Sequence, residues 1–378
     1  MTLKLLTRLY FGIQRQLLPA LEEEIGPLDD KAKQFVNVCE MLHLETHLEA
    51  CVWLGNGRPP KSRFILAQAF VAKALWNIPT TKDLLRQLRQ NTTLRRLCGW
   101  HDGPRSVPDE STFSRAFATF ANIGLGQRVH ETLMATHLGS EVIWHCGTDG
   151  TAIEARESVA KAVEAPVVQE QAPSEVKPKR KRGRPRKGEE PPPPEPTRLQ
   201  RHLEGTLEAN MKDMPQVQCD YGCKKNSQGN TDWWRGYKLH IATGDGDIPL
   251  YAYLSSASMH DSQAAIIIEQ QVAERTRGVL YQLKDSAYDA QAIREHSGRV
   301  GSVPIIEKRN YRSEDAIPME PDRARHYRAR SSSERVNSDL KDNHGGRSVR
   351  VRGGAKVATH LMFGILVMSA EALLRLVV

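Results

Sequence analysis

The sequence predicts an α/β fold in which a mixed β-sheet with flanking helices follows an all-helical N-terminal region. Two patterns lead to this prediction. Residues 1–136 contain mostly helical patterns of apolar residues, whereas strand-like and helix-like segments alternate between residues 143 and 307. Such alternation is typical of a sheet with helices packed on its faces. A third pattern, a basic and proline-rich run within residues 158–230, interrupts the alternation after its first strand.

The N-terminal region is expected to consist of short helices joined by tight turns. Apolar side chains recur with helical spacing in residues 64–74, Pro79 ends that helix, and Thr80 or Thr81 caps the next one. Several arginines surround these helices: Arg86, Arg89, Arg95, Arg96 and Arg115. The arrangement permits a helix-turn-helix-like contact with DNA, and an ordinary helical bundle with a basic, solvated surface is the alternative.

The alternating part of the chain begins with a strand from Ile143 to Ile153, where apolar and β-branched residues alternate. The turn-prone GDGD of residues 244–247 separates two further strand patterns, which predicts a β-hairpin. Two more strands, GVLYQL and SVPIIE, and two helices capped by Asp261 and Asp289 complete the alternation. Together these segments predict one mixed sheet.

The composition favours a soluble, cytoplasmic protein with a polyanionic partner, because the formal net charge is +8. The six cysteines do not form the framework of a small secreted domain, and the N-terminus has no signal-peptide pattern. The apolar stretch 361–378 is interrupted by Glu371 and Arg375. Charges are costly in lipid, so we expect residues 351–378 to form a buried helix on the core and not a membrane span.

Residues 158–230 are expected to be a disordered insertion, because the run PKRKRGRPRKGEEPPPPEP cannot bury enough apolar surface to fold. The insertion separates residues 137–157, the first part of the predicted catalytic core, from residues 231–350, its remainder. Its Arg182 and Arg184 belong to an R-G-R-P motif that is similar to AT-hooks, whose arginines bind the minor groove of A·T tracts. A nonspecific basic linker is the alternative.

One segment combines an acid with residues suited to phosphate binding. Four of its residues, separated by three, four and seven positions, would share one face of a continuous helix: Tyr327, Arg330, Glu334 and Lys341. A carboxylate beside cations suits a group that binds a metal ion while its neighbours contact phosphate oxygens. The alternative is structural, because Ser331 and Glu334 also match a capping box, which would start the helix at this point.

Two further acids are placed where metal ligands could lie. Asp149 lies within the first predicted strand and has only glycine and threonine around it, which leaves room for a hydrated metal ion and a DNA backbone. Asp285 follows the end of another strand, where α/β sheets present ligand-binding groups. Each acid alone is more typical of a turn or a solvated surface, and only their combination favours a metal site.

These segments resemble the DDE transposases of bacterial insertion sequences that carry a Y-x2-R-x3-E-x6-K signature. Besides the four residues of that signature, the similar blocks are DGTAIEA at Asp149, WRGYKLH at 234–240, HDS at 260–262 and KDSAYDAQAIR at Asp285. The resemblance implies a ribonuclease-H-like core with Asp149, Asp285 and Glu334 as metal-binding catalytic triad. It also implies that Tyr327, Arg330 and Lys341 contact DNA. The glycine after Asp149 departs from the serine or threonine common in the family.

The resemblance predicts a transposase that cleaves transposon ends and joins them to target DNA. Carboxylate ligands favour Mg²⁺ or Mn²⁺, and two such ions can activate water or a 3′-hydroxyl for in-line attack on phosphorus. The expected partner is double-stranded DNA, contacted in part by residues 1–136, and the family implies a homodimer in the DNA complex. Two alternatives stay open, a plain metal-dependent nuclease and a non-enzymatic DNA-binding regulator derived from a transposase.

Overall fold

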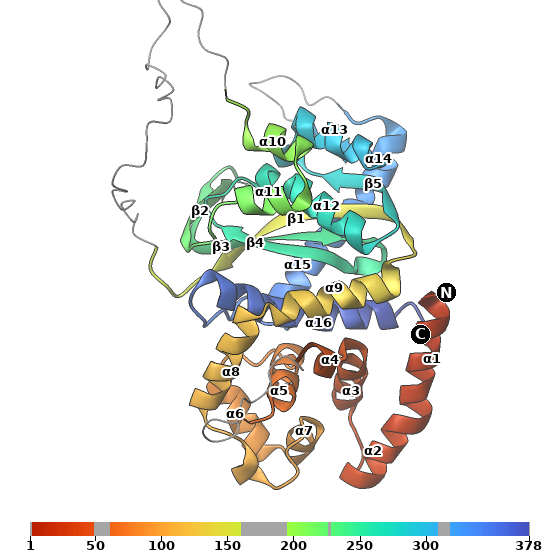
Figure 1. The fold of residues 1–378 in the computed structure, drawn as a ribbon, viewed down its shortest axis with the longest axis vertical. Coiled ribbons are helices and arrows are strands. Elements are labelled where there is room, and N and C mark those ends of the chain that lie inside the picture. The colour runs from red at the N-terminus through yellow and green to blue at the C-terminus, as the bar shows by residue number, and fades with distance from the viewer. Residues whose placement is uncertain (1, 49–60, 160–194, 226–227, 309–317, 378) are drawn as a thin grey trace, which may run out of the picture.

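The computed structural model describes residues 2–48, 61–159, 195–225, 228–308 and 318–377, and its N-terminal region is helical as predicted (Figure 1). The helices of this region are α1 (Thr2–Gly12), α2 (Leu18–Ile25), α3 (Asp30–Leu42), α4 (Leu44–Leu48), α5 (Arg63–Leu75), α6 (Thr81–Gln90), α7 (Thr92–Leu97), α8 (Glu110–Asn122) and α9 (Leu125–Leu138). A π-helical turn, Ile13–Leu17, joins α1 to α2. The predicted cap at Thr80 is confirmed, since its side chain accepts a hydrogen bond from the Asp83 amide at 3.0 Å.

The helix α16 (Gly354–Leu374) forms the centre of the molecule. Figure 1 shows it between the sheet and most of the N-terminal helices, and it packs against α5, α9 and β4 (Pro249–Ser256). Phe363 of α16 contacts Phe70, Phe117 and Phe120, and these rings join α16 to α5 and α8. The helix is long and apolar enough to cross a membrane, but it is mostly buried inside the protein. The prediction of a buried helix is confirmed, and its packing extends beyond the predicted core.

The sheet is mixed, as predicted, and the described part of the chain contributes six strands to it. Its long strands β1 (Val142–Glu154) and β3 (Thr231–Thr243) are antiparallel neighbours, and β3 also pairs with β4 in the predicted hairpin and with β2 (Asp220–Lys225). The strands β5 (Gly278–Lys284) and β6 (Val303–Ile306) extend the sheet in parallel from β1. The strand β1 therefore lies in the middle of the sheet, between an antiparallel and a parallel neighbour.

Helices cover both faces of this sheet (Figure 1). One face packs against α12 (Ala265–Arg275) and α13 (Gln291–Arg299), and the other packs against α15 (Ser331–Asn343) and α16. The two predicted caps are wrong: Asp261 begins a short 3₁₀-helix and forms an ion pair with Lys238, and Asp289 pairs with Arg294. Both carboxylates find a cation, which is a stronger partner than a backbone amide.

The second part of the predicted disordered insertion is folded. Within residues 195–225 the structure contains α10 (Arg198–Glu204), α11 (Leu207–Asp213) and β2. A capping box between Thr197 and Gln200 starts α10, and its Leu199 and Leu203 pack on the apolar cluster that includes Ile266. The prediction of disorder is therefore wrong for this part, because the segment does have apolar residues to bury. The arginines Arg182 and Arg184 lie outside the described residues.

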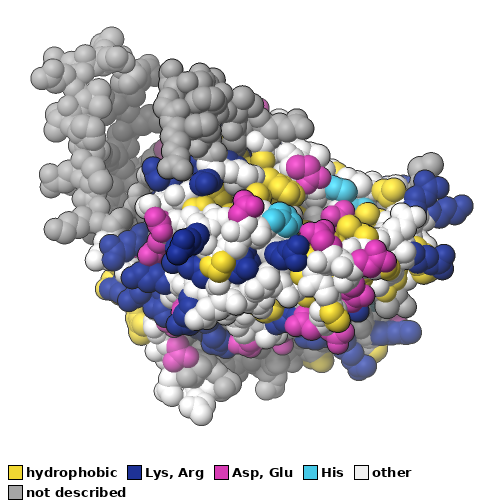
Figure 2. All heavy atoms as spheres, turned by 90° about the horizontal axis from the view of Figure 1, so that it is seen from below, with side chains coloured by type: hydrophobic (Ala, Val, Ile, Leu, Met, Phe, Trp, Pro, Cys, Tyr) yellow, Lys and Arg dark blue, Asp and Glu magenta, His cyan; other side chains and the backbone are white. Residues whose placement is uncertain are grey.

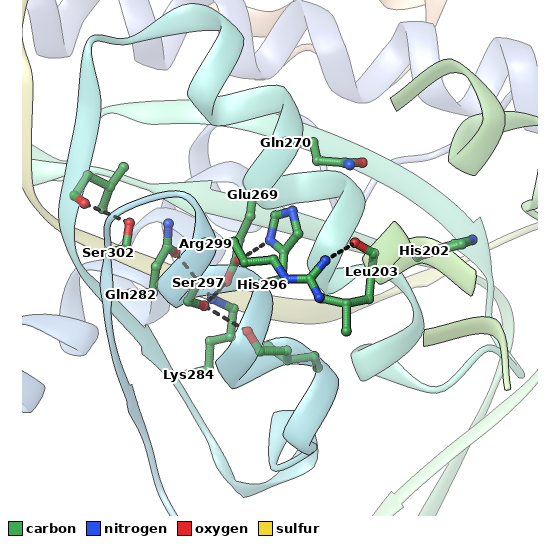
Figure 3. A network of polar contacts seen from close by, with 12 residues as sticks. His202, Leu203, Glu269, Gln270, Gln282, Lys284, His296, Ser297, Arg299 and Ser302 are labelled. Atoms are coloured by element: carbon green, nitrogen blue, oxygen red, sulfur yellow. Dashed lines mark hydrogen bonds and ion pairs between the residues drawn. The ribbon is translucent and has the colours of Figure 1, made fainter. Parts of the chain in front are cut away.

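A buried polar network fixes the end of β5 (Figure 3). The Nζ atom of Lys284 on β5 lies 2.7 Å from Oε1 of Glu269 on α12. The same carboxylate binds Nδ1 of His296 at 2.6 Å and accepts a hydrogen bond from Ser297 Oγ, and both of these residues belong to α13. The charges on Lys284 and Glu269 are thus paired and hydrogen-bonded, as burial requires. The network ties α12 and α13 to the strand that ends next to Asp285.

Candidate active site

Asp149 lies in the middle of β1, opposite Ile241 of β3. Its Oδ2 atom accepts a hydrogen bond from Nδ2 of Asn337 on α15 at 3.0 Å. The glycines on either side of Asp149 allow neighbouring groups to come close. A Cβ atom at Gly147 would lie 2.4 Å from Ser333 Oγ of α15, and one at Gly150 would lie 2.9 Å from an oxygen of Asp261. Their small size therefore brings α15 and Asp261 up to the strand.

Asp285 follows directly on β5, the parallel neighbour of β1. Thr148 pairs with Lys284 in this register, so Asp149 and Asp285 are the next residues along the two adjacent chain segments. The Asp285 side chain accepts a hydrogen bond from the Ala287 amide at 2.9 Å and so starts a short 3₁₀-turn, Ser286–Tyr288. Two acids that are far apart in the sequence are therefore brought together by strand pairing.

The segment that carries the third acid, Glu334, is almost continuously helical. α14 (Pro321–Tyr327) leads through a 3₁₀-turn (Arg328–Arg330) into α15, and Tyr327, Arg330 and Ser331 all have right-handed helical backbone angles. The alternative of a capping box is wrong, because no side chain caps α15 and Ser331 Oγ accepts a hydrogen bond from Arg335 instead. The helical arrangement of the signature residues is thus preserved up to Glu334.

The three predicted acids converge on the guanidinium group of Arg330. One terminal nitrogen of Arg330 lies 3.7 Å from Oδ1 of Asp149 and 3.8 Å from Oδ2 of Asp285. The other terminal nitrogen lies 2.9 Å from Oε1 of Glu334, which is the most exposed of the three acids. Each acid therefore has a carboxylate oxygen within 4 Å of one cationic group.

The site carries excess negative charge. Burial raises the pKa of Asp149 to about 6, although the charge of Arg330 opposes that change, and the nearby charges of Asp285 and Asp261 add to it. Burial also raises the pKa of Asp285. Three carboxylates around one guanidinium leave a net negative charge, which a bound cation would compensate.

The site also fits a hydrated divalent cation in its choice of donor atoms. Carboxylate oxygens are the ligands that Mg²⁺ and Mn²⁺ prefer. Buried oxygens without a hydrogen-bond partner lie around the acids, among them Tyr288 Oη and Ser333 Oγ. Within the described residues, however, no group of three or more His, Cys, Asp or Glu side chains has a metal-holding geometry. Arg330 lies among the three carboxylates, where such an ion would bind.

Two protein-family profiles match the chain. A transposase domain matches residues 20–119, and a transposase DDE domain matches residues 217–369. The chain belongs to the DDE transposases. The mixed sheet with its helices is accordingly a ribonuclease-H-like domain preceded by a helical region. No curated protein and no solved structure shows a significant match.

The matched ranges contain Asp285 and Glu334 of the transposase, whereas Asp149 lies between the two ranges. The structure nevertheless places Asp149 in the same sheet as the matched DDE domain, because β1 pairs with both β3 and β5 of that domain.

The remaining signature residues lie on both sides of the acids. Tyr327 Oη donates a hydrogen bond to Glu307 at 3.4 Å, just beyond β6. Lys341 lies near the other end of α15 and is half-buried. Burial lowers the pKa of Lys341, and the charges of Lys224 and Arg347 lower it further. Basic groups thus continue along the transposase from the acids toward the end of α15.

Sequence reasoning missed two residues of this site. Asn337, which binds Asp149, lies three residues after Glu334 and thus on the same side of α15. That spacing was the available signal. Asp261 lies close to Gly150 and pairs with Lys238 Nζ at 2.8 Å. The sequence predicts this aspartate of the HDS block as a helix cap, and the structure places it beside the site instead.

Proposed function

We propose that this transposase cleaves double-stranded DNA at transposon ends and transfers the strands into target DNA, with divalent metal ions held by Asp149, Asp285 and Glu334. The convergence of these acids on Arg330 is the observation that supports the proposal most directly. Bound Mg²⁺ or Mn²⁺ would supply activation of water or a 3′-hydroxyl and stabilisation of the leaving oxygen.

The side chains around the three acids would position the acids and bind the DNA backbone. Asn337 holds one oxygen of Asp149, which leaves its other oxygen directed toward Arg330. Arg330 offsets part of the negative charge of the acids and can turn to a phosphate oxygen, since a guanidinium can bind carboxylate and phosphate with the same bidentate geometry. Tyr327 and Lys341 flank the acids and would orient the DNA backbone. We place the reaction in the cytoplasm, in a homodimer that holds two DNA ends.

The N-terminal helices are proposed to contribute DNA contacts. α6 buries Leu84, Leu85 and Leu88 against the region's core and directs Arg86 and Arg89 outward. These arginines pair only with Asp83 and Asp109 among the described residues, at exposed positions where ion pairs are weak. DNA phosphates can therefore replace those partners at little cost.

The test uses the full-length chain and a duplex copied from the inverted repeats that flank its coding sequence. We expect Mg²⁺-dependent nicking at the element's end, and its loss in each of Asp149→Ala, Asp285→Ala and Glu334→Ala while DNA binding is largely retained. Asp322→Ala, which removes an exposed acid of the neighbouring α14, is the matched control and should nick normally. Normal nicking by one of the three variants would remove that residue from the triad.

Two further outcomes separate the alternatives. A pre-cut duplex with a free 3′-hydroxyl should be joined to target DNA, and nicking without joining would indicate a plain nuclease. Specific binding of the inverted repeat without any cleavage in Mg²⁺ or Mn²⁺ would indicate a regulator that has lost its chemistry.

A further inference from the structure

A second basic feature lies away from the acids, at the junction of the N-terminal helices and the DDE domain. It is a cavity of about 740 Å³, lined by residues of α5, α6, α8, the segment after β1, and the segment that leads into α16. Six of its lining side chains are cationic: Lys73, Lys82, Arg156, Arg350, Arg352 and Lys356. Among the described residues that line it, Glu110 is the single acid. We call it the junction cavity.

Lys73 distinguishes the junction cavity from an ordinary basic surface. It lies in α5 between the buried residues Ala72 and Ala74, and only 8% of its surface is exposed. No carboxylate of the described residues lies within ion-pair distance of its Nζ atom, and Asp83, the acid that acts on it from further away, is already bound by Thr80 and Arg86. Burial lowers the pKa of Lys73 to about 8.

An uncompensated ammonium group on the wall of a cavity is costly, because burial removes part of its water and supplies no anion in its place. Alanine, leucine or methionine at this position of α5 would avoid that cost. The lysine is therefore better explained by an anion that enters the junction cavity and is absent from the free protein. The volume suits a ligand larger than a single inorganic ion.

The position of the junction cavity relative to the acids identifies a suitable anion. Arg156 lies seven residues beyond Asp149, just past the end of β1, so the two are at most about 23 Å apart at roughly 3.3 Å per residue. In the sequence, Lys341 and Arg347 lie between Glu334 of α15 and the cavity residues that precede α16. The positive charge of Arg347 lowers the pKa of Lys341, so these two cations lie near each other. In Figure 2, lysine and arginine side chains gather toward the left, the side on which Figure 1 shows α8 and the start of α16.

We propose that the junction cavity binds a phosphodiester of the transposon-end duplex, with Lys73 as its buried anchor, while the acids hold the cleaved bond. Because the phosphates of one strand follow each other at about 3.4 Å along the axis of the duplex, the contacted phosphate would lie on the order of six nucleotides from that bond. This inference rests on the proposed function for the identity of the DNA. It adds a contact that joins the N-terminal helices and the DDE domain through one ligand.

The experiment measures binding of a labelled inverted-repeat duplex by the full-length chain in EDTA, across a range of KCl concentrations. Lys73→Met should weaken binding roughly tenfold at low salt and reduce the slope of log Kd against log salt by about 1. Arg350→Gln, an exposed change at the cavity, should act in the same direction. Lys212→Met, at an exposed position on α11 outside the cavity, is the matched control and should bind like the parent chain.

Thermal unfolding separates an anchor from a structural lysine. If Lys73 is an anchor, Lys73→Met keeps or raises the Tm of the free protein, since it removes an unpaired buried charge. A lower Tm for Lys73→Met, combined with unchanged binding by Arg350→Gln, would overturn the proposal. A second result would also overturn the proposal: pyrophosphate raises the Tm of the parent chain, and neither variant changes DNA binding. The cavity would then bind a small anion and not DNA.

These measurements do not depend on cleavage. Loss of the proposed catalytic function would leave the binding results intact, and a failed binding result would leave the nicking assay unaffected. Ethylation of single phosphates in the duplex gives a direct position: interference about six nucleotides from the cleaved bond should be present for the parent chain and absent for Lys73→Met.

Discussion

Gly147 shows how one residue controls the distance between the central strand and the helix that carries Glu334. A Cβ atom there would lie 2.4 Å from Ser333 Oγ, far inside normal contact, and Ser333 is buried. Because α15 packs against β1 along this line, a side chain at this position would require the Ser333 hydroxyl to rotate away or the helix to withdraw. The sequence pattern of small residues around Asp149 was interpreted as room for a metal ion and DNA, and for Gly147 the structure shows a packing role.

We therefore expect Gly147→Ala to impair catalysis through geometry. The helix would move away from β1, which separates Glu334 from Asp149 and Asp285, and the overpacking should cost about 1–3 kcal/mol of stability. The measurement is the rate of Mg²⁺-dependent nicking together with the free energy of unfolding, and we expect at least a tenfold lower rate.

Gly298→Ala supplies the control for this prediction. Gly298 lies in α13, where an added Cβ would meet no atom within 4 Å. Alanine there should stabilise the helix by roughly 0.5–1 kcal/mol and leave nicking unchanged. Normal nicking by Gly147→Ala would show that the close approach of α15 is not required.

At the scale of elements, the network of Glu269, Lys284 and His296 determines how α12 and α13 sit on β5. Removing one partner of a buried ion pair leaves the other charge uncompensated, which typically costs 3–5 kcal/mol. Lys284→Met should therefore lower the free energy of unfolding by several kcal/mol, as measured by urea denaturation.

The double variant Lys284→Met with Glu269→Leu tests the cause of that loss. The double variant removes both charges and keeps similar volume, but it also leaves His296 Nδ1 and Ser297 Oγ without the carboxylate that binds them. It should therefore recover part of the lost stability. Equal stability of the single and double variants would show that the lysine acts by its size and not by its charge.

The elements also show what could be predicted from sequence and why. The strands β1, β3 and β4 were predicted because alternation between buried and exposed side chains shapes their local pattern, and α16 was predicted because its apolar stretch is nearly continuous. The caps at Asp261 and Asp289 were predicted incorrectly. Lys238, the partner of Asp261, is distant in the sequence and becomes available only in the folded protein. Arg294, the partner of Asp289, follows it by five residues, so this competition was present in the local sequence.

The site itself was predictable as a set of residues but not as an arrangement. Tyr327, Arg330 and Glu334 were recognised from spacing, whereas the central position of Arg330 depends on the register that brings Asp149 beside Asp285. The folded segment with α10, α11 and β2 was missed, because the basic and proline-rich run before it dominates the composition. Its capping box and leucines were visible in the sequence.

At the scale of the whole molecule, His130 lies where the N-terminal helices meet the sheet. It belongs to α9, is 2% exposed, and binds the carbonyl oxygen of Pro249 at the start of β4 through Nε2 at 2.9 Å. Ser369 of α16 reaches the same carbonyl oxygen at 3.5 Å. Burial lowers the pKa of His130 to about 4, so the folded protein holds this side chain neutral.

The sign of the resulting pH dependence follows from linkage. An unfolded histidine has a pKa of about 6.5, so between pH 6.5 and pH 4 the unfolded chain binds a proton that the folded chain does not. The stabilisation is therefore complete above pH 6.5 and declines as the pH falls toward 4, by up to about 3 kcal/mol in total.

His130→Gln tests this coupling, because the glutamine amide can still donate to Pro249 but does not titrate. We expect the free energy of unfolding of the variant to be close to that of the parent chain at pH 7 and to exceed it at lower pH. Below pH 6.5 its slope against pH should be shallower by up to about 1.4 kcal/mol per pH unit. Urea denaturation monitored by circular dichroism across this pH range gives the slope. Parallel curves for the two proteins would show that His130 titrates normally and that the contact between α9 and β4 does not exclude its charged form.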